Sequence, residues 1–188
     1  MAKKAPSNIS VIEAYNACNE DIKNYYSELI SLLEDEKFSY ETAISYCFLK
    51  LEQALHIILY GGLVKLHKVD TKLAQNKIQG IHLTRESFII LYKNIYSKKI
   101  PYVIQDKIKL AELTRDRVMH GKRVQNNDIR EAIIDILEYS NDFMNEVKKQ
   151  AKFNPFGNIK GYAGRYTPLN KQTTAWLLKG ILEIEKKK

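Results

Sequence analysis

Apolar residues recur along most of this chain in alternating steps of three and four, which places them on one face of an α-helix. The first run follows Ser10 and Glu13, a pair typical of a helix N-terminus, and predicts a helix over about 11–36. The second run is more apolar and predicts a buried helix from about 44 to the glycine pair at 61 and 62, where we expect it to fray or bend. Two long helices are therefore expected before the middle of the chain.

Two further long helices are predicted in the second half of the chain. Pro101 suits the start of a helix over about 102–120, and Gly121 suits its end. Asp128 with Glu131 begins the last long helix, whose apolar residues keep the same spacing. Because no segment shows the alternation of a β-strand, we predict an all-α fold in which the four long helices form an antiparallel four-helix bundle.

Shorter helices are expected outside this bundle. Helical pieces near 72–79 and 85–97, the second beginning after Thr84, are interpreted as a short insertion beside it. The helical spacing stops over 154–170, where glycines and prolines indicate an irregular loop, and a final helix is expected over about 171–184.

We predict two domains, a helical bundle over residues 1–152 and a basic C-terminal extension over 153–188 that ends in a helix. Residues 1–146 hold 20 Lys and Arg against 20 Asp and Glu, and residues 147–188 hold 10 against 2, so the net charge of +8 comes from the end of the chain. Aromatic residues alternate there with the cations, a mixture suited to phosphates and stacked bases, and RNA is the expected partner. The alternative is a solubilising segment whose aromatic side chains pack back on the bundle.

Neither secretion nor membrane spanning is expected. The first seven residues contain two lysines with no apolar run after them, and the most apolar window, Ala43–Val64, is interrupted by Lys50 and Glu52. Cys18 and Cys47 fall on apolar helix faces without the spacing of metal ligands, which favours reduced core thiols. A cytoplasmic protein is the resulting expectation.

The best candidate for chemistry is the segment 115–122, at the end of the third long helix. Arg115 is permanently cationic and is able to bind a phosphate through two parallel donors. His120 can act as base or acid near neutral pH. Asp116 precedes it by four residues, so the carboxylate would lie on the same helix face and orient the imidazole. These residue types in this order suit cleavage of a phosphodiester.

The segment resembles the motif of the HEPN superfamily, small helical domains in which an arginine is followed by a polar residue, three variable residues and a histidine. Arg115, Asp116 and His120 hold these positions here, between the last two long helices, as in the family. The resemblance implies an endoribonuclease that works as a homodimer without a metal ion, with Arg115 and His120 in the active roles. Some HEPN domains have no nuclease activity and bind RNA, nucleotides or a partner protein.

Arg115 shares a helix face with apolar residues at 104, 108, 111 and 118, where an unpaired charge is unfavourable. Two explanations of this position are open. Arg115 faces a groove or subunit interface that receives phosphate, or it forms a buried ion pair with a carboxylate of another helix. His120 lies about 140° further around an ideal helix, so the two side chains meet only if the helix unwinds before Gly121 or a second copy contributes. An isologous dimer would bring two of each together and leave a 2′,3′-cyclic phosphate and a 5′-hydroxyl.

The remaining residues are weaker candidates. The other histidines lack paired ligand spacing, so neither a metal site nor a cofactor is predicted, and the glycine pair matches no phosphate-binding loop. Lys122 and Arg123 are either ordinary surface charges or contacts to the substrate strand. The candidate RNA-binding residues are Lys122, Arg123, Lys160, Arg165 and Lys171.

Two functions agree with these observations. The first is a metal-independent endoribonuclease that acts as a toxin or anti-phage defence effector under the control of an antitoxin or regulatory protein. The second is a non-catalytic RNA-binding or protein-interaction module in a larger complex.

Overall fold

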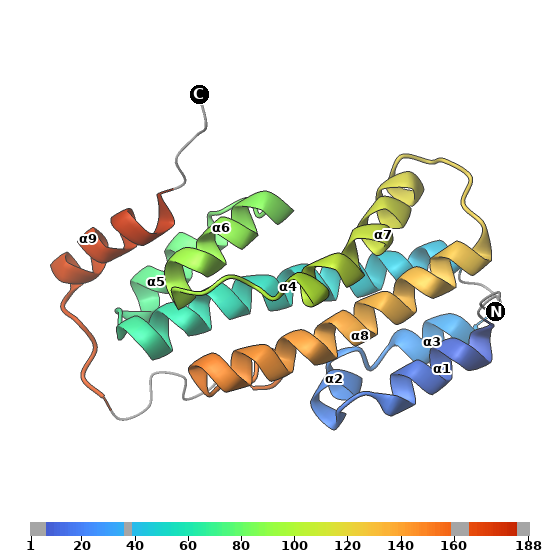
Figure 1. Ribbon diagram of the computed structural model, residues 1–188, viewed down its shortest axis with the longest axis horizontal. Coiled ribbons are helices and arrows are strands. Elements are labelled where there is room, and N and C mark those ends of the chain that lie inside the picture. Colours follow the sequence, from blue (N-terminus) through green and yellow to red (C-terminus); the bar gives the residue numbers. More distant parts are fainter. Residues whose placement is uncertain (1–6, 36–38, 159–165, 184–188) are drawn as a thin grey trace. The chain divides into compact units, whose positions relative to one another are not determined.

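The computed structural model describes residues 7–35, 39–158 and 166–183, and every regular element in these ranges is an α-helix (Figure 1). The all-α prediction is therefore confirmed. The helices are α1 (Asn8–Ala17), α2 (Glu20–Tyr25), α3 (Leu29–Glu34), α4 (Tyr40–His67), α5 (Thr71–Gln79), α6 (Arg85–Tyr96), α7 (Tyr102–Met119), α8 (Asn126–Ala151) and α9 (Lys171–Leu182).

The helices form two compact units, each built from two stretches of the chain. The first unit combines residues 1–51 with 101–145 and contains α1 to α3, the first part of α4, α7 and most of α8. The second unit combines residues 52–100 with 146–188 and contains the rest of α4, α5, α6, the end of α8 and α9. This grouping differs from the predicted boundary after residue 152; that boundary and the antiparallel four-helix arrangement stay predictions.

The prediction of one continuous helix over 11–36 is wrong, because three short helices occupy this part of the chain. Asn19 caps α2 with its side chain, and Tyr26 ends that helix with a non-helical backbone (φ −102°). Tyr26 is fully buried, and its hydroxyl lies 2.9 Å from that of Ser140 in α8. A buried hydroxyl needs a hydrogen-bond partner, so this contact between distant residues favours an interrupted path over a regular helix.

Two predicted helix starts have different outcomes. Ser10 and Glu13 do not begin α1, because Ser7 is the N-cap and its hydroxyl accepts the backbone N–H of Ser10 at 3.3 Å. Thr84 does cap α6, as predicted, and its hydroxyl accepts the backbone N–H of Ser87 at 3.1 Å.

The glycine pair in α4 forms a packing surface and does not end the helix, which continues to His67. A Cβ atom on Gly61 would lie 2.4 Å from the ring of Phe153, and one on Gly62 would lie 2.6 Å from Ile95 and 2.8 Å from Tyr96. All three distances are shorter than real contacts, so only glycine lets these side chains approach the helix so closely. The expected bend is absent because packing within the second unit compensates for the low helix propensity of glycine.

The described part of the basic extension packs into the second unit. Phe153 and Phe156 are buried, in agreement with the alternative in which aromatic residues pack back. The hydroxyl of Thr174 in α9 accepts the backbone N–H of Asp70 at 3.1 Å, and α9 contacts α5 and α6. Trp176 differs from these residues, because it is 68% exposed.

α4 is long and apolar enough to cross a membrane by length and composition, and 56% of its most apolar window is buried within the protein. A core helix meets the same criteria, so the expectation of no membrane span stays a prediction. Cys47 in α4 is buried and Cys18 is half-buried, and both are free thiols, as predicted. Burial raises the pKa of both thiols, that of Cys18 to about 11.

Candidate functional site

The candidate segment lies where α7 stops. Gly121 adopts the left-handed conformation (φ +66°), which glycine accepts without strain. The backbone N–H of Gly121 donates to Val118 at 2.9 Å, and that of Lys122 donates to Arg117 at 2.9 Å. These two bonds satisfy the last carbonyls of the helix and make His120 its C-cap. The prediction that Gly121 ends this helix is confirmed.

A partly buried ion pair holds α7 against α8. The ammonium of Lys107 lies 2.7 Å from Asp142 and 3.3 Å from Glu138, and both carboxylates belong to α8. The hydrogen bond to Asp142 raises the pKa of Lys107, with the bond to Glu138 adding to it. Ile104 and Ile108 are buried on the inner face of the same helix. The direction in which the end of α7 points is therefore fixed within the first unit.

Arg115 projects towards α4 within the first unit. Its guanidinium carbon lies 4.8 Å from the ring centroid of Phe48, a cation–π distance, and Phe48 is 5% exposed. Its Nε lies 3.2 Å from a carboxylate oxygen of Asp116, and the Arg115 side chain is 30% exposed. This ion pair joins neighbours on one helix, and neither explanation offered by the sequence, a groove or interface that receives phosphate or an ion pair with another helix, is tested by it.

Asp116 and His120 lie one turn apart, as predicted, but their described contact is through the backbone. The N–H of His120 donates to the carbonyl oxygen of Asp116 at 3.0 Å, while the Asp116 carboxylate lies beside Arg115. His120 is exposed. Because α7 stays helical through Met119, it does not unwind before His120, and Arg115 and His120 lie on different faces of the helix.

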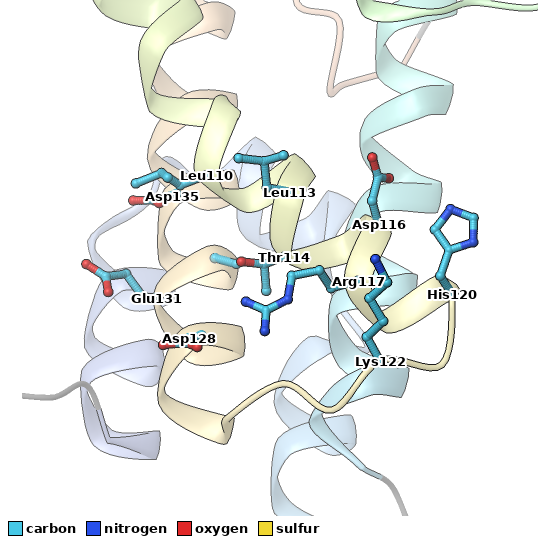
Figure 2. A pocket seen from close by; sticks show the side chains of 11 residues that line it. Leu110, Leu113, Thr114, Asp116, Arg117, His120, Lys122, Asp128, Glu131 and Asp135 are labelled. Carbon is cyan, nitrogen blue, oxygen red and sulfur yellow. The ribbon is translucent and has the colours of Figure 1, made fainter.

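A groove of about 520 Å³ lies beside His120, between α7 and α8 (Figure 2). On the side of α7 it is lined by Leu110, Leu113, Arg117 and His120, and Lys122 follows from the turn after the helix. Figure 2 shows the side chain of Arg117 extending into the space between the two helices. Arg115 does not line this groove. The imidazole therefore shares its groove with Arg117 and Lys122, which are not the motif arginine.

The opposite wall of the groove is acidic. Asp128, Glu131 and Asp135 follow one another at steps of three and four on α8, and all three line the groove (Figure 2). Asp116 lines the groove from α7, so a ligand there meets Arg117 and Lys122 near the end of α7 and carboxylates on both walls.

A second hollow, of about 780 Å³, adjoins the groove. It is lined by Arg117, Arg123 and residues 124–128, from the turn after α7 to the first turn of α8. Arg117 and Asp128 line both hollows. The guanidinium of Arg117 also donates to the carbonyl oxygen of Arg123 at 3.5 Å. Arg117 is thus the cation that the groove and the second hollow share.

Comparison of the chain with protein-family models, curated proteins and solved structures gives no match. The resemblance to HEPN domains therefore rests on residues 115–120 and stays a prediction. Among the residues that the structure describes, no group of three His, Cys, Asp or Glu side chains is arranged to hold a metal ion.

The candidate RNA-binding residues fall into three groups. Lys122 lines the groove and Arg123 the second hollow, both in the first unit. Lys171 is the exposed first residue of α9, in the second unit. Lys160 and Arg165 lie outside the described residues.

Sequence reasoning did not single out Arg117 or the acidic wall. The signal was present, because residues 110, 113, 117 and 120 keep the three-four spacing that puts side chains on one helix face. The motif assigned the cationic role to Arg115, which is five residues from His120, and not to Arg117, which is three residues from it.

Proposed function

We propose that the protein is a metal-independent endoribonuclease of HEPN type, which cleaves RNA as a homodimer and acts as a toxin or anti-phage defence effector. The position of His120 carries this proposal. The imidazole is exposed at the groove, where a substrate can reach it, and histidine is the side chain most often used for proton transfer in catalysis. Arg117 and Lys122 line the same groove and attract phosphate groups.

The reaction requires one base and one acid. A ribose 2′-oxygen attacks the adjacent phosphorus while the base removes its proton, and the bond to the 5′-oxygen breaks as the acid protonates that oxygen. The two His120 residues of a dimer supply these groups, and Arg115 stabilises the negative charge that develops on the phosphoryl oxygens. The products are a 2′,3′-cyclic phosphate and a 5′-hydroxyl.

The outer surface of α7 supports a dimer. Leu110 is 68% exposed and Leu113 is 61% exposed, and the two are three residues apart on one face of the helix. Exposed apolar side chains gathered on one helix are typical of protein interfaces. Because Arg115 and His120 lie on different faces of one helix, a shared site needs a second copy, and two-fold pairing along this surface is the simplest arrangement.

The proposal is tested by incubating the purified protein with RNA in the presence of a chelator. The wild type is expected to produce cyclic-phosphate ends, and His120→Ala to abolish them. His82→Ala is the matched control, because His82 is also exposed but belongs to the second unit. Arg115→Gln should also abolish cleavage, and its melting temperature must be measured because Arg115 stacks on Phe48. An inactive wild type, or full activity of both variants, would contradict the proposal.

A non-catalytic RNA-binding or protein-interaction module is the second candidate. It is favoured by the surroundings of Arg115, which is already engaged by Asp116 and by the ring of Phe48. In this case the basic extension binds RNA, and the motif has a structural role. Lys171→Gln with Lys179→Gln would weaken RNA binding without disturbing the packing, because both lysines are exposed on α9. Deleting residues 153–188 is a poorer test, because it removes the buried Phe153 and Phe156.

A further inference from the structure

Helix geometry separates the two arginines that flank Asp116. Arg117 and His120 are three residues apart, which puts their side chains within about 60° of each other around α7. Both line the groove, whereas Arg115 lies over Phe48. Figure 2 shows the Arg117 side chain extending toward α8 and the imidazole of His120 on the other side of Lys122. To meet a phosphate bound beside the imidazole, the exposed Arg117 side chain has to rotate toward the end of α7.

The exposure of these side chains leaves them accessible to a ligand. Arg117, Lys122 and Arg123 are all exposed, and they surround the turn between α7 and α8. Arg117 lines the groove and the second hollow, and Arg123 lines the second hollow, so the two arginines provide cations in adjoining hollows, a path for an anionic strand. Consecutive phosphates of a single strand are suited to such a path, since each guanidinium can bind one phosphate through parallel donors.

The acidic wall restricts where a phosphate can lie. Carboxylates of Asp128, Glu131 and Asp135 repel a phosphate from the side of α8. On the side of α7 the carboxylate of Asp116 lies 3.2 Å from Nε of Arg115, so the favourable position for a phosphate is near Arg117 and Lys122. Asp128 lines both hollows with Arg117 and is therefore the carboxylate with the greatest influence on the proposed path.

We propose that Arg117 binds the scissile phosphate of RNA beside His120 of the same chain and that Arg123 binds the neighbouring backbone phosphate. This inference rests on the proposed function and adds a catalytic residue to it, because Arg117 touches the reacting group. Arg115 then acts from the second copy, and Arg117 fixes the substrate in each half of the site.

The test measures binding of a short single-stranded 2′-O-methyl RNA, which cannot be cleaved because its 2′-oxygen is blocked. Arg117→Gln should weaken binding by about tenfold, the value of one charge-assisted contact. The slope of log affinity against log salt concentration should fall by about 0.7, the value for one phosphate of a single strand. Arg117→Lys should keep most of the affinity, and Asp128→Asn should increase it.

Lys109→Gln is the matched control, because Lys109 is on α7 and carries the same charge but pairs with Asp106 at 2.6 Å and lines neither hollow. Its affinity should stay within about twofold of the wild type, a change below about 0.5 kcal/mol. If Arg117→Gln binds as tightly as Lys109→Gln, or if the wild type does not bind the oligonucleotide, the inference is wrong. If the wild type cleaves RNA but Arg117→Gln binds the oligonucleotide normally, the proposed function stands and the phosphate site is wrong. If the wild type binds the oligonucleotide through Arg117 but does not cleave RNA, the phosphate site stands and the nuclease function is wrong.

Discussion

Gly61→Ala tests the close approach of Phe153 to α4. The new Cβ atom would lie 2.4 Å from Cζ and 2.5 Å from Cε2 of the phenylalanine ring. Carbon atoms in contact are normally about 3.5–4.0 Å apart, so the ring would have to shift by about 1 Å. Phe153 is 5% exposed, which leaves little space for such a shift.

Two effects of opposite sign determine the result. Alanine in place of glycine inside a helix stabilises it by about 1 kcal/mol. Forcing extra volume into a packed core costs about 1–3 kcal/mol, so the net loss for Gly61→Ala is about 0–2 kcal/mol. Gly180 in α9 is the matched control, because nothing lies within 4 Å of a Cβ atom placed there. Gly180→Ala should stabilise the protein by about 1 kcal/mol.

The assay is urea unfolding followed by circular dichroism, with the transition midpoints compared at equal slopes. The free energies of unfolding of the two alanine variants should differ by about 1–3 kcal/mol. In a Phe153→Ala background the steric overlap is absent, so Gly61→Ala should become stabilising, and the double-mutant cycle measures the coupling. If Gly61→Ala stabilises the wild type as much as Gly180→Ala does, the packing explanation is refuted.

Three other perturbations test the interface, a buried hydrogen bond and the thiols. Leu113→Glu should convert the proposed dimer to a monomer, measured by light scattering, and abolish RNA cleavage. Ile9→Glu is the control, at a position 67% exposed on α1, and should change neither the mass nor the cleavage. An unchanged mass for Leu113→Glu would count against the interface. Tyr26→Phe should lower the free energy of unfolding by about 1–3 kcal/mol, because the buried Ser140 hydroxyl loses its partner; a loss below the error of urea titration would contradict this. Burial raises the pKa of Cys18 to about 11, so as pH rises the thiol of the unfolded chain, which ionises near 9, loses its proton before the thiol of the folded protein. The contribution of Cys18 to stability is therefore complete below pH 9 and is lost towards pH 11. Cys18→Ser should reduce the fall in the urea unfolding midpoint between pH 7 and pH 10.

Much of the helical structure could be predicted from local signals. The expected helices near 72–79, 85–97, 102–120 and 171–184 agree with α5, α6, α7 and α9 to within two residues. These segments have a capping residue or a terminating glycine next to an apolar stripe, so their limits are set within a few positions of the chain.

The errors come from contacts between residues distant in the chain. The second break in the first predicted helix lies at Tyr26, whose hydroxyl contacts Ser140, a partner 114 residues away that no local pattern reveals. The bend expected at the glycine pair is absent because Phe153, Ile95 and Tyr96 fill the space beside it. In both cases tertiary packing overrides a local preference.

The candidate site was predicted only in part. Its location at the end of α7 could be read from Arg115, His120 and Gly121, because the end of a helix has a recognisable sequence. The groove could not, since it depends on α8 facing α7 and on the direction of Arg117. The acidic row on α8 was visible as a spacing, but its relation to His120 required the three-dimensional arrangement.

The left-handed turn at Gly121 makes the number of residues before it critical. Each residue added within α7 would rotate all later positions of the helix by about 100°. An insertion between Arg117 and His120 would therefore leave the arginine in place and carry the imidazole out of the groove, with no side chain altered. Related chains that keep the same chemistry should vary in side-chain identity at 118 and 119 but conserve the distance along the helix, so this interval is a stricter signature of the site than any single amino acid within it.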